Sequence, residues 1–326
     1  MARRVLRNVL SPALALAAVA AGVLVLVPKK PAYEVTFFLA SDPHYGAGPE
    51  VAAANRKIVD AMNRLPGTAY PPQIGGVIGQ PRGVAVLGDL INDAASPQAS
   101  DFWQLYTGDF GVDGEGRLKF PVYENSGNHD GGEDQIVRQG IRERNKVRRG
   151  LTAISPNGIN YSWDWEAVHF VNLGLYAGSE GETFASPWGR RFEGSWRLPG
   201  HSLEFLADDL ARNVGRSGRP VVLMQHYGWD VWGMGWWSDR ERQALADVIK
   251  EYRVIAVFWG HTHTVQRVDV EGIPTFCVGS SQAGRTPGSF MVVRIRPKEM
   301  IVAERKTDGW GLVDRLILRK RKGTRR

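Results

Sequence analysis

The stretch VIAVFWGHTH, from Val254 to His263, sets the pattern that decides the fold. Six apolar residues follow one another without a charge, the run stops at Gly260, and His261 and His263 come directly after it. A short, continuous apolar run of this kind is typical of a strand buried on both faces. The stretch therefore predicts an internal strand whose carboxyl end carries two imidazole groups.

The same pattern recurs four more times along the chain. Apolar runs at residues 35–40, 84–87, 121–123 and 221–224 each lead, within a few residues, to Asp, His or Asn. The side chains placed in this way are Asp42, His44, Asp89, Asn128, His129, Asp130 and His226. Sites in open α/β sheets form beyond the carboxyl ends of strands. We therefore expect these side chains to converge on one site, although they are far apart in sequence.

Helical patterns alternate with these strands. Apolar residues at helical spacing predict helices at residues 51–65 and 203–213, and a capping box at Ser238 opens a third helix. The runs 161–165 and 168–173 predict a β-hairpin. Strands that alternate with helices indicate an α/β core.

The histidines are concentrated in the strand-end clusters, which hold five of the seven in the chain. His169 falls inside a strand and His201 near a helix start, where structural roles are expected. Imidazole nitrogens combined with carboxylate and amide oxygens suit Zn, Mn or Fe better than Ca or Mg. The single cysteine, Cys277, excludes an internal disulfide framework and a Cys-rich zinc site. The sequence thus predicts a metal site without thiolate ligands.

The order of the motifs resembles that of the calcineurin-like metallophosphoesterases. The matching motifs are Asp42-x-His44, Gly88-Asp89, Gly127-Asn128-His129-Asp130, a separate His226, and Gly260-His261-x-His263. The resemblance covers about residues 35–265 and the strands beyond. It implies an α/β fold with a four-layer α/β/β/α sandwich, in which two mixed β-sheets are flanked by helices, over residues 33–318.

The resemblance also implies a role for each motif residue. One metal ion would be bound by Asp42, His44, Asp89 and His263. Asp89 would bridge to a second metal ion, whose other ligands would be Asn128, His226 and His261. His129 would not bind metal but would face the leaving oxygen of the substrate, with Asp130 behind it as the orienting carboxylate.

Two divalent or trivalent metal ions (Mn, Fe or Zn) are the cofactors that the family implies. Such a pair clamps an in-line displacement at phosphorus and lowers the pKa of a shared water, so that a metal-bridging hydroxide attacks while His129 assists the leaving group. Phosphomonoesters are the expected substrates, as small molecules, phosphoproteins or phospholipids. A phosphodiesterase or nucleotidase is the alternative within the family. A catalytically silent, envelope-tethered scaffold is the alternative outside it, although no ligand has been lost.

One subfamily pattern is absent. Purple acid phosphatases carry a tyrosine three residues after the Asp of the Gly-Asp motif, where this chain has Asn92. They also carry Asp-x-Gly where this chain has Asp42-Pro43-His44. A purple tyrosinate–iron site is therefore not expected, despite Tyr45 nearby.

The net charge of +7 is carried by the two ends of the chain. Residues 1–30 hold five bases and no acid, and residues 319–326 hold six bases, which leaves 30 bases against 34 acids in the body. A protein that binds DNA or RNA through a basic groove would need a basic body. No nucleic-acid partner is therefore expected.

The N-terminal segment, residues 1–32, has the pattern of a signal peptide or a membrane anchor. Three arginines precede an uncharged apolar run, residues 13–27, which reaches 19 residues when extended back to Val9. That length approaches the ~20 residues that span a bilayer, and the absence of a convincing cleavage site favours an uncleaved single-pass anchor. The preceding arginines favour an exported body on the periplasmic or extracytoplasmic face. The basic tail, residues 319–326, is expected to be a solvated end rather than an anionic-lipid contact.

Two further segments leave their roles open. Four tryptophans lie within nine residues of one another, and they predict either a wall of the site or a self-packed aromatic loop; they are Trp229, Trp232, Trp236 and Trp237. Five arginines follow the His129 motif, and a solvated helix face is favoured over substrate binding for them; they are Arg138, Arg142, Arg144, Arg148 and Arg149.

Overall fold

Strand β1 (Val35–Ala40) is the organising element of the fold in this computed structural model, which describes residues 32–179, 197–230, 233–282 and 288–318. Every residue of β1 is buried. It pairs in parallel with β2 (Val84–Leu87) and antiparallel with β11 (Ser289–Arg296). Its continuous apolar sequence therefore reflects a central strand covered on both faces.

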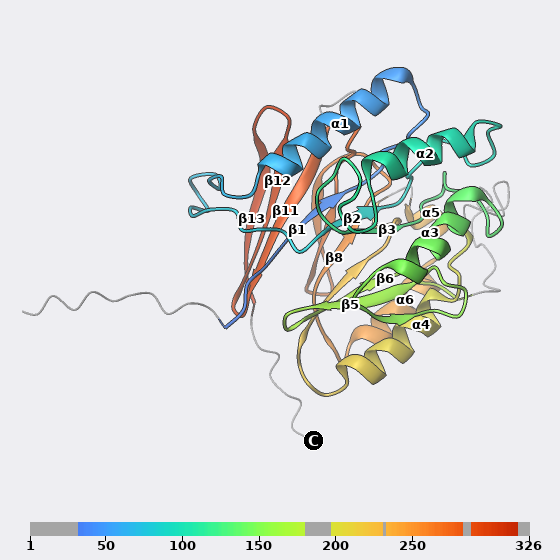
Figure 1. Cartoon of the computed structure of the whole chain (residues 1–326). Helices are drawn as coiled ribbons and strands as arrows, with labels where there is room; N and C mark the ends of the chain where they lie inside the picture. The colour runs from blue at the N-terminus through green and yellow to red at the C-terminus, as the bar shows by residue number, and fades with distance from the viewer. Residues whose placement is uncertain (1–31, 180–196, 231–232, 283–287, 319–326) are drawn as a thin grey trace, which may run out of the picture. The chain divides into compact units, whose positions relative to one another are not determined.

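The first sheet has six strands in the order β13-β12-β11-β1-β2-β3 (Figure 1). Its remaining strands are β3 (Val122–Asn125), β12 (Glu299–Lys306) and β13 (Trp310–Ile317). β1, β2 and β3 are parallel, whereas β11, β12 and β13 form an antiparallel meander.

The second sheet has seven strands in the order β4-β5-β6-β7-β8-β10-β9. They are β4 (Leu151–Ile154), β5 (Tyr161–Trp165), β6 (Val168–Asn172), β7 (Pro220–Met224), β8 (Arg253–Trp259), β9 (Gln266–Val270) and β10 (Ile273–Cys277). β6, β7, β8 and β10 run parallel. The predicted hairpin is confirmed as the antiparallel pair β5–β6.

The two sheets pack face to face. Phe37 of β1 lies between the sheets, with its ring 5.3 Å from Phe170 of β6 and 6.3 Å from Phe258 of β8. Its neighbour Phe38 points to the opposite face, where it joins the core under the helices. This alternation is the two-residue period of a strand.

Helices cover the outer face of each sheet (Figure 1). The first sheet is covered by α1 (Pro49–Arg64), α2 (Ala99–Asp109) and α3 (Ile136–Val147). The second is covered by α4 (Ser202–Asp209), the π-helical turn Leu210–Val214, the short α5 (Gly233–Trp236) and α6 (Asp239–Ile249). The four-layer sandwich with two mixed sheets flanked by helices is therefore confirmed.

Local sequence signals predicted three of these helices, namely α1, α4 with the π-helical turn, and α6. α1 begins with Pro49, whose missing N–H costs nothing at a helix start, and α6 is opened by the predicted capping box of Ser238 and Glu241. α2 was not predicted, and α3 was expected only as the helix face favoured for the arginines after His129. Neither has a side-chain N-cap, and the buried face of α3 includes Arg138 and Arg144, which an apolar pattern does not reveal.

Both charged ends of the chain lie outside the described residues. The structure therefore leaves the anchor or signal segment, residues 1–32, and the tail, residues 319–326, as predictions. Within the described ranges, no helix combines the length and the apolar character needed to cross a membrane.

Candidate metal centre

Five loops, each leaving the carboxyl end of a strand, meet at one edge shared by the two sheets. β1, β2 and β3 of the first sheet lead into Asp42, Asp89 and Asn128, and β7 and β8 of the second lead into His226 and His261. Three groups of ligand-type side chains form there, with ligand atoms within 4.8 Å of one another; they are Asp42–His44–His263, His44–Asp89–His129 and Asp89–His226–His261. The predicted convergence on one site is confirmed.

Left-handed backbone conformations are concentrated in these loops. Eight described non-glycine residues have positive φ, and five of them are site residues: Asp42 (51°), His44 (42°), Asp89 (51°), His261 (75°) and His263 (59°). An L-residue pays a steric cost in this region, although Asp and His tolerate it better than most. Such strain persists only where the surroundings impose it, and it collects at functional sites.

Two motif glycines are required because the loops approach one another closely. A Cβ on Gly127 would overlap the backbone nitrogen and the carboxylate of Asp89. A Cβ on Gly260 would lie 2.8 Å from the carbonyl oxygen of Leu87 and 2.9 Å from a carboxylate oxygen of Asp42. Both distances are shorter than real Cβ contacts, so glycine at these positions allows loops from different strands to bring their ligands together.

The first half of the site joins Asp42, His44 and His263. The Nε2 atoms of His44 and His263 lie 3.0 Å apart, and the Asp42 carboxylate lies 3.5 Å from the Nε2 of His263 and 3.9 Å from that of His44. Asp42 also accepts the backbone N–H of His261, which fixes its orientation. Three atoms that can donate lone pairs therefore face one small volume.

The second half joins Asp89, Asn128 and His226. The Nε2 of His226 lies 3.0 Å from the Asn128 Oδ1 and 3.3 Å from the Asp89 Oδ2. On its other nitrogen, His226 Nδ1 donates to the carbonyl of Leu87 at 2.7 Å. A backbone carbonyl on Nδ1 is the usual device that presents Nε2 to a metal ion.

Asp89 connects the halves. Its Oδ2 lies 3.6 Å from the Nε2 of His44, in addition to its approach to His226. Its Oδ1 accepts the backbone N–H of His129 at 2.9 Å. Asp89 is therefore placed to be shared between two cations.

These residues fit a pair of metal ions. Imidazole nitrogens converge with buried carboxylates and an amide oxygen, which is the donor set that Mn, Fe and Zn accept. Two imidazole Nε2 atoms 3.0 Å apart repel each other unless a proton or a cation lies between them. The site would hold one metal ion through Asp42, His44, Asp89 and His263, and the second through Asp89, Asn128, His226 and His261.

Burial and neighbouring charges shift the histidine pKa values within the site in opposite directions. Burial lowers the pKa of His44 to about 4, and burial together with His226 lowers that of His261 to about 4. Both imidazoles are therefore neutral and ready to bind a cation near neutral pH. For His226, the Asp89 carboxylate outweighs the effect of burial and raises the pKa to about 9. Without metal, His226 thus supplies positive charge beside two buried carboxylates.

The contacts of His129 correct one expectation. Its Nδ1 donates to the carbonyl oxygen of Asn92 at 2.6 Å, which leaves Nε2 as the reactive nitrogen. Asp130, expected to orient His129, instead accepts the backbone N–H groups of Ile91 and Gly127 with its two oxygens. Burial, with the charge of Asp89 as a second cause, raises the pKa of Asp130 to about 6. The Asn92 carbonyl orients the imidazole, and Asp130 ties the loop after β3 to the loop after β2.

Three polar residues that brace the first ligand loop were not predicted. Ser280 Oγ donates to the carbonyl of Asp42, and Ser281 N–H donates to the carbonyl of Ser41. Asn55 of α1 donates to the carbonyl of Pro43. Ser280 and Ser281 follow β10 and so obey the strand-end rule, but serine is too common a residue to have singled them out.

The arginines after His129 are neither a solvated helix face nor gathered at the site. Arg144 and Arg148 are buried, and they bind the fully buried carboxylate of Glu124 at 2.8 and 2.6 Å. Arg138 is also buried and donates to the carbonyl of Gly131. Of the five, Arg149 is well exposed. The solvated-face interpretation is therefore wrong for the buried members of the set.

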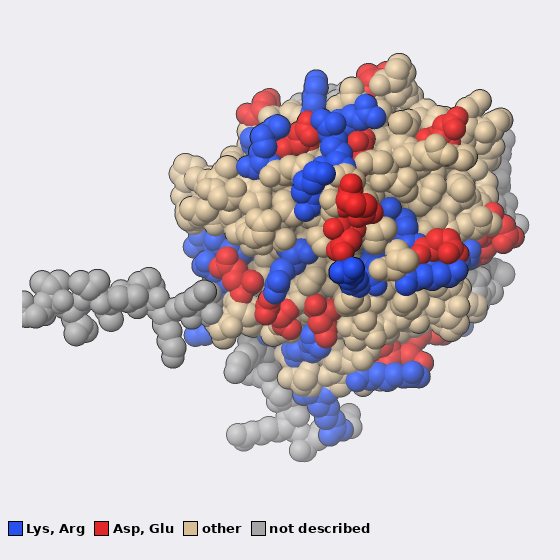
Figure 2. Space-filling view, in the orientation of Figure 1, with Lys and Arg blue, Asp and Glu red and all other residues tan. Residues whose placement is uncertain are grey.

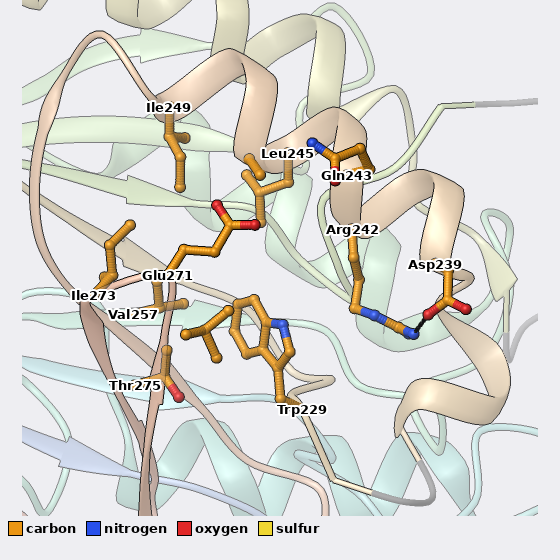
Figure 3. A pocket seen from close by; sticks show the side chains of 12 residues that line it. Trp229, Asp239, Arg242, Gln243, Leu245, Ile249, Val257, Glu271, Ile273 and Thr275 are labelled. Carbon is orange, nitrogen blue, oxygen red and sulfur yellow. Dashed lines mark hydrogen bonds and ion pairs between the residues drawn. The ribbon is translucent and has the colours of Figure 1, made fainter.

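The tryptophan-rich segment is in part self-packed. Trp237 is fully buried and donates its indole N–H to the carbonyl of Ala177, and Trp229 packs against it with ring centroids 4.9 Å apart. Trp229 also lines a cavity of about 280 Å³ opposite Leu245 and Ile249 of α6 (Figure 3). The residues that line this cavity include no candidate metal ligand. Trp232 lies outside the described residues.

His169 and Tyr45 have contacts that suit structural roles, and His201 is exposed. His169 is fully buried between the carboxylates of Asp164 and Asp209, and His201 precedes α4. The hydroxyl of Tyr45 donates to Asp109 of α2. The tyrosine nearest in sequence to the first ligands is thus engaged with a helix.

Comparison with known proteins identifies relatives of this architecture. The chain is 28% identical to purple acid phosphatase 23 of Arabidopsis thaliana over 158 residues, which is 46% of this chain and 30% of that protein. A dimetal phosphatase from Danio rerio has a similar fold, with a TM-score of 0.62 at 15% identity over 89% of this chain and 100% of the other. GAP50, the anchor in the inner membrane complex of Plasmodium, superposes with a TM-score of 0.54 at 12% identity, over 90% of this chain and 91% of its own.

The family follows from the extent of the sequence match. The profile of the calcineurin-like phosphoesterases matches residues 35–265, from the first residue of β1 to just beyond the last histidine of the site. This span contains every strand-end motif described above. The chain therefore belongs to the calcineurin-like phosphoesterase family, whose members are hydrolases that act on phosphate esters at dinuclear metal centres.

Proposed function

We propose that this protein is a metal-dependent phosphatase that hydrolyses phosphomonoesters. The observation that carries the proposal is the pair of ligand groups that share Asp89 at the common edge of both sheets. When bound, two metal ions would supply the positive charge that binds a phosphoryl oxygen and the Lewis acidity that activates a water molecule.

The chain's own residues would then have distinct tasks. Asp42, Asp89, Asn128 and the four imidazoles around them would hold the cations, and the loops with left-handed residues fix the positions of these side chains before substrate arrives. His129 lies beside this set, 4.8 Å from the ring of His44. Because its Nδ1 is held by the Asn92 carbonyl, its Nε2 is the nitrogen that donates a proton to the leaving oxygen. No covalent enzyme intermediate is required.

The surface charge of the domain favours a small, soluble or protein-borne phosphate ester over a nucleic acid as the substrate. Lys and Arg are interspersed with Asp and Glu on the face shown in Figure 2. A phosphate backbone is bound by a continuous basic surface. We also propose that residues 1–32 anchor this domain on the extracytoplasmic side of a membrane, which the arginine-flanked apolar run supports.

The test is a substrate screen of the full chain loaded separately with Mn, Zn or Fe. We expect phosphate release from p-nitrophenyl phosphate to exceed product release from bis-p-nitrophenyl phosphate and from a phospholipid panel. Preferred hydrolysis of the diester would replace the monoesterase assignment by a phosphodiesterase. No release with any metal would favour a scaffold, a use of this fold consistent with the anchor described for GAP50.

A further inference from the structure

The two ends of the described domain meet at one place, away from the metal centre. Glu34, just before β1, forms an ion pair with Arg296 at 2.6 Å, and the N–H of Leu318, just after β13, donates to the carbonyl of Lys298 at 2.9 Å. Arg296 is the last residue of β11, and Lys298 lies in the turn between β11 and β12. Figure 1 shows the start of β1 and the end of β13 at the same end of the first sheet.

A groove of about 510 Å³ lies at this end. Its apolar part includes Leu316, Ile317 and Leu318, and Ile317 is 68% exposed. Its basic part includes Lys250, just after α6, and Arg253, at the start of β8; Lys250 forms an exposed ion pair with Asp247 at 3.1 Å. An apolar floor beside two cations matches the interfacial region of an anionic bilayer.

Arg253 is the residue that points most directly to a ligand. Two of its guanidinium nitrogens, Nε and Nη2, are buried yet find no hydrogen-bond partner among the described residues. Buried donors without partners are rare because each one loses its hydration without replacement. Burial raises the pKa of Tyr33 and the charge of Arg253 partly opposes this rise, so the guanidinium lies close to Tyr33, just before β1.

The acidic residues of the groove leave this basic part intact. Asp269 is paired with Arg267, which also pairs with Asp314 outside the groove lining. Glu271 lies where the groove adjoins the cavity of Figure 3, and it lines both. Of these two carboxylates, that of Asp269 is therefore paired, and that of Glu271 is turned toward the neighbouring cavity.

The sequence on either side of the domain has the character of membrane-binding segments. Residues 13–27 are apolar and uncharged, and residues 319–326 hold six bases and no acid. Each basic residue near an anionic membrane surface adds about fivefold to the binding constant. The composition of both segments thus suits the same partner as the groove, and for the tail this replaces the solvated end expected from the sequence.

We propose that one end of the domain, here called the terminal face, lies on an anionic phospholipid surface. The terminal face is formed by Glu34, the 296–299 turn, Leu316–Leu318, Lys250 and Arg253. Lys250 exchanges its exposed ion pair with Asp247 for a lipid phosphate group, Arg253 adds positive charge behind it, and the basic tail adds to the attraction. The inference rests on the proposed anchoring by residues 1–32. It extends that proposal because it fixes which end of the domain meets the bilayer.

This orientation decides where substrate comes from. The metal ligands follow the carboxyl ends of β1 and β8, whereas the terminal face contains the residues at their amino ends. A strand of six residues, such as β1, is roughly 20 Å long. The metal centre therefore opens toward the aqueous phase, and its substrates are soluble phosphate esters rather than lipids of the same bilayer.

The test places a fluorophore at either end of the full chain reconstituted in vesicles. Cys277 is fully buried, so a cysteine introduced by Lys298→Cys or Ala95→Cys takes the label; Ala95 is exposed in the loop after β2. The vesicles contain phosphatidylcholine alone or with phosphatidylglycerol, and a nitroxide-headgroup lipid quenches the fluorophore. We expect the label at position 298 to be quenched, more strongly with phosphatidylglycerol, and the label at position 95 to remain bright.

Paired variants identify the residues responsible. In the Lys298→Cys background, Lys250→Gln with Arg253→Gln should abolish the added quenching by phosphatidylglycerol, whereas Lys57→Gln with Arg64→Gln, on the exposed side of α1, should preserve it. The inference would be overturned by equal quenching at positions 298 and 95, by no quenching at position 298, or by no effect of the Lys250→Gln/Arg253→Gln pair. Failure of the chain to float with vesicles would overturn it as well. Hydrolysis of p-nitrophenyl phosphate by the same samples reports separately on the proposed function.

Discussion

The metal centre and the cluster of Glu124, Arg144 and Arg148 are both buried and charged, but they differ in whether their charges have partners within the chain. In the second region, here called the Glu124 cluster, one carboxylate meets two guanidiniums, and every charge has a partner from the chain. Arg144 and Arg148 also donate to backbone carbonyls and lie over aromatic rings, as Arg148 does over Tyr161 at 4.9 Å. In the metal centre, by contrast, lone pairs converge on one another.

The difference separates a structural ion cluster from a functional one. The Glu124 cluster is satisfied by its own residues, so it has nothing left to bind. The metal centre has carboxylates and neutral imidazoles whose charge and lone pairs are completed only by cations from solution. Buried charge alone is therefore a weak indicator of function, and unbalanced donor atoms are the stronger one.

The largest effect is expected for Asp89→Ala, which removes the carboxylate shared by both halves of the centre. We expect the loss of bound metal and the abolition of phosphate release. The metal-free thermal midpoint should fall, because alanine keeps the left-handed φ of position 89 and the protonated His226 loses its carboxylate partner. Metal analysis of the purified variant beside its activity checks this. Full metal content in Asp89→Ala would contradict the shared-ligand role.

His129→Ala should leave the ligand set intact while removing the proton donor. We expect turnover to fall roughly 10²–10⁴-fold, the usual contribution of general acid catalysis, with metal content unchanged. His201→Ala, outside the centre and before α4, is the matched histidine control and should retain full turnover. Equal metal loss in His129→Ala and Asp89→Ala would make His129 a ligand.

Glu124→Gln tests the other side of the comparison. It leaves two buried guanidiniums without their counter-charge, and breaking a buried pair in this way costs about 3–5 kcal/mol of unfolding free energy. Denaturant unfolding measures the loss, and the folded fraction should still bind metal. Glu143→Gln, which breaks the exposed pair with Lys146, is the control and should cost no more than about 0.5 kcal/mol.

The smallest effect concerns acid stability. Burial alone would raise the pKa of Glu124, but Arg144 and Arg148 outweigh it and lower the pKa to about 2, from an ordinary value of 4.5. The ionised carboxylate thus stabilises the fold fully above pH 4.5, and this stabilisation is lost as pH falls toward 2. The difference in unfolding free energy between the wild type and Glu124→Gln should narrow over that window. A constant difference would show that charge pairing is not its source.

Much of the fold and of the site followed from the sequence because both depend on the same local signal. A buried strand must be apolar along its length, and the parallel strands of one sheet end at one edge. The run 254–259 and its four counterparts therefore predicted the strands, their convergence and the ligand-type residues together. The capping box of α6 was equally local.

What the sequence did not reveal depends on contacts between distant or adjacent side chains. Arg144 pairs with Glu124, 20 residues earlier on β3, and an arginine-rich helix gives no sign that its partner is buried. Asp130 is the chain neighbour of His129, yet its carboxylate binds backbone amides while the imidazole binds the carbonyl of Asn92. Proximity in sequence suggested a side-chain pair that the turn of the backbone does not form.

The left-handed backbone of the metal ligands has a consequence for laboratory evolution. Each such residue raises the free energy of the metal-free chain, by about 1–3 kcal/mol where the conformation is unfavourable. Glycine accepts the same φ without that cost. A lineage selected for heat resistance alone, with no demand for catalysis, is therefore expected to replace Asp89 or His44 by glycine before it alters β1. Positions that drift first under such selection would mark the active centre without any assay of its chemistry.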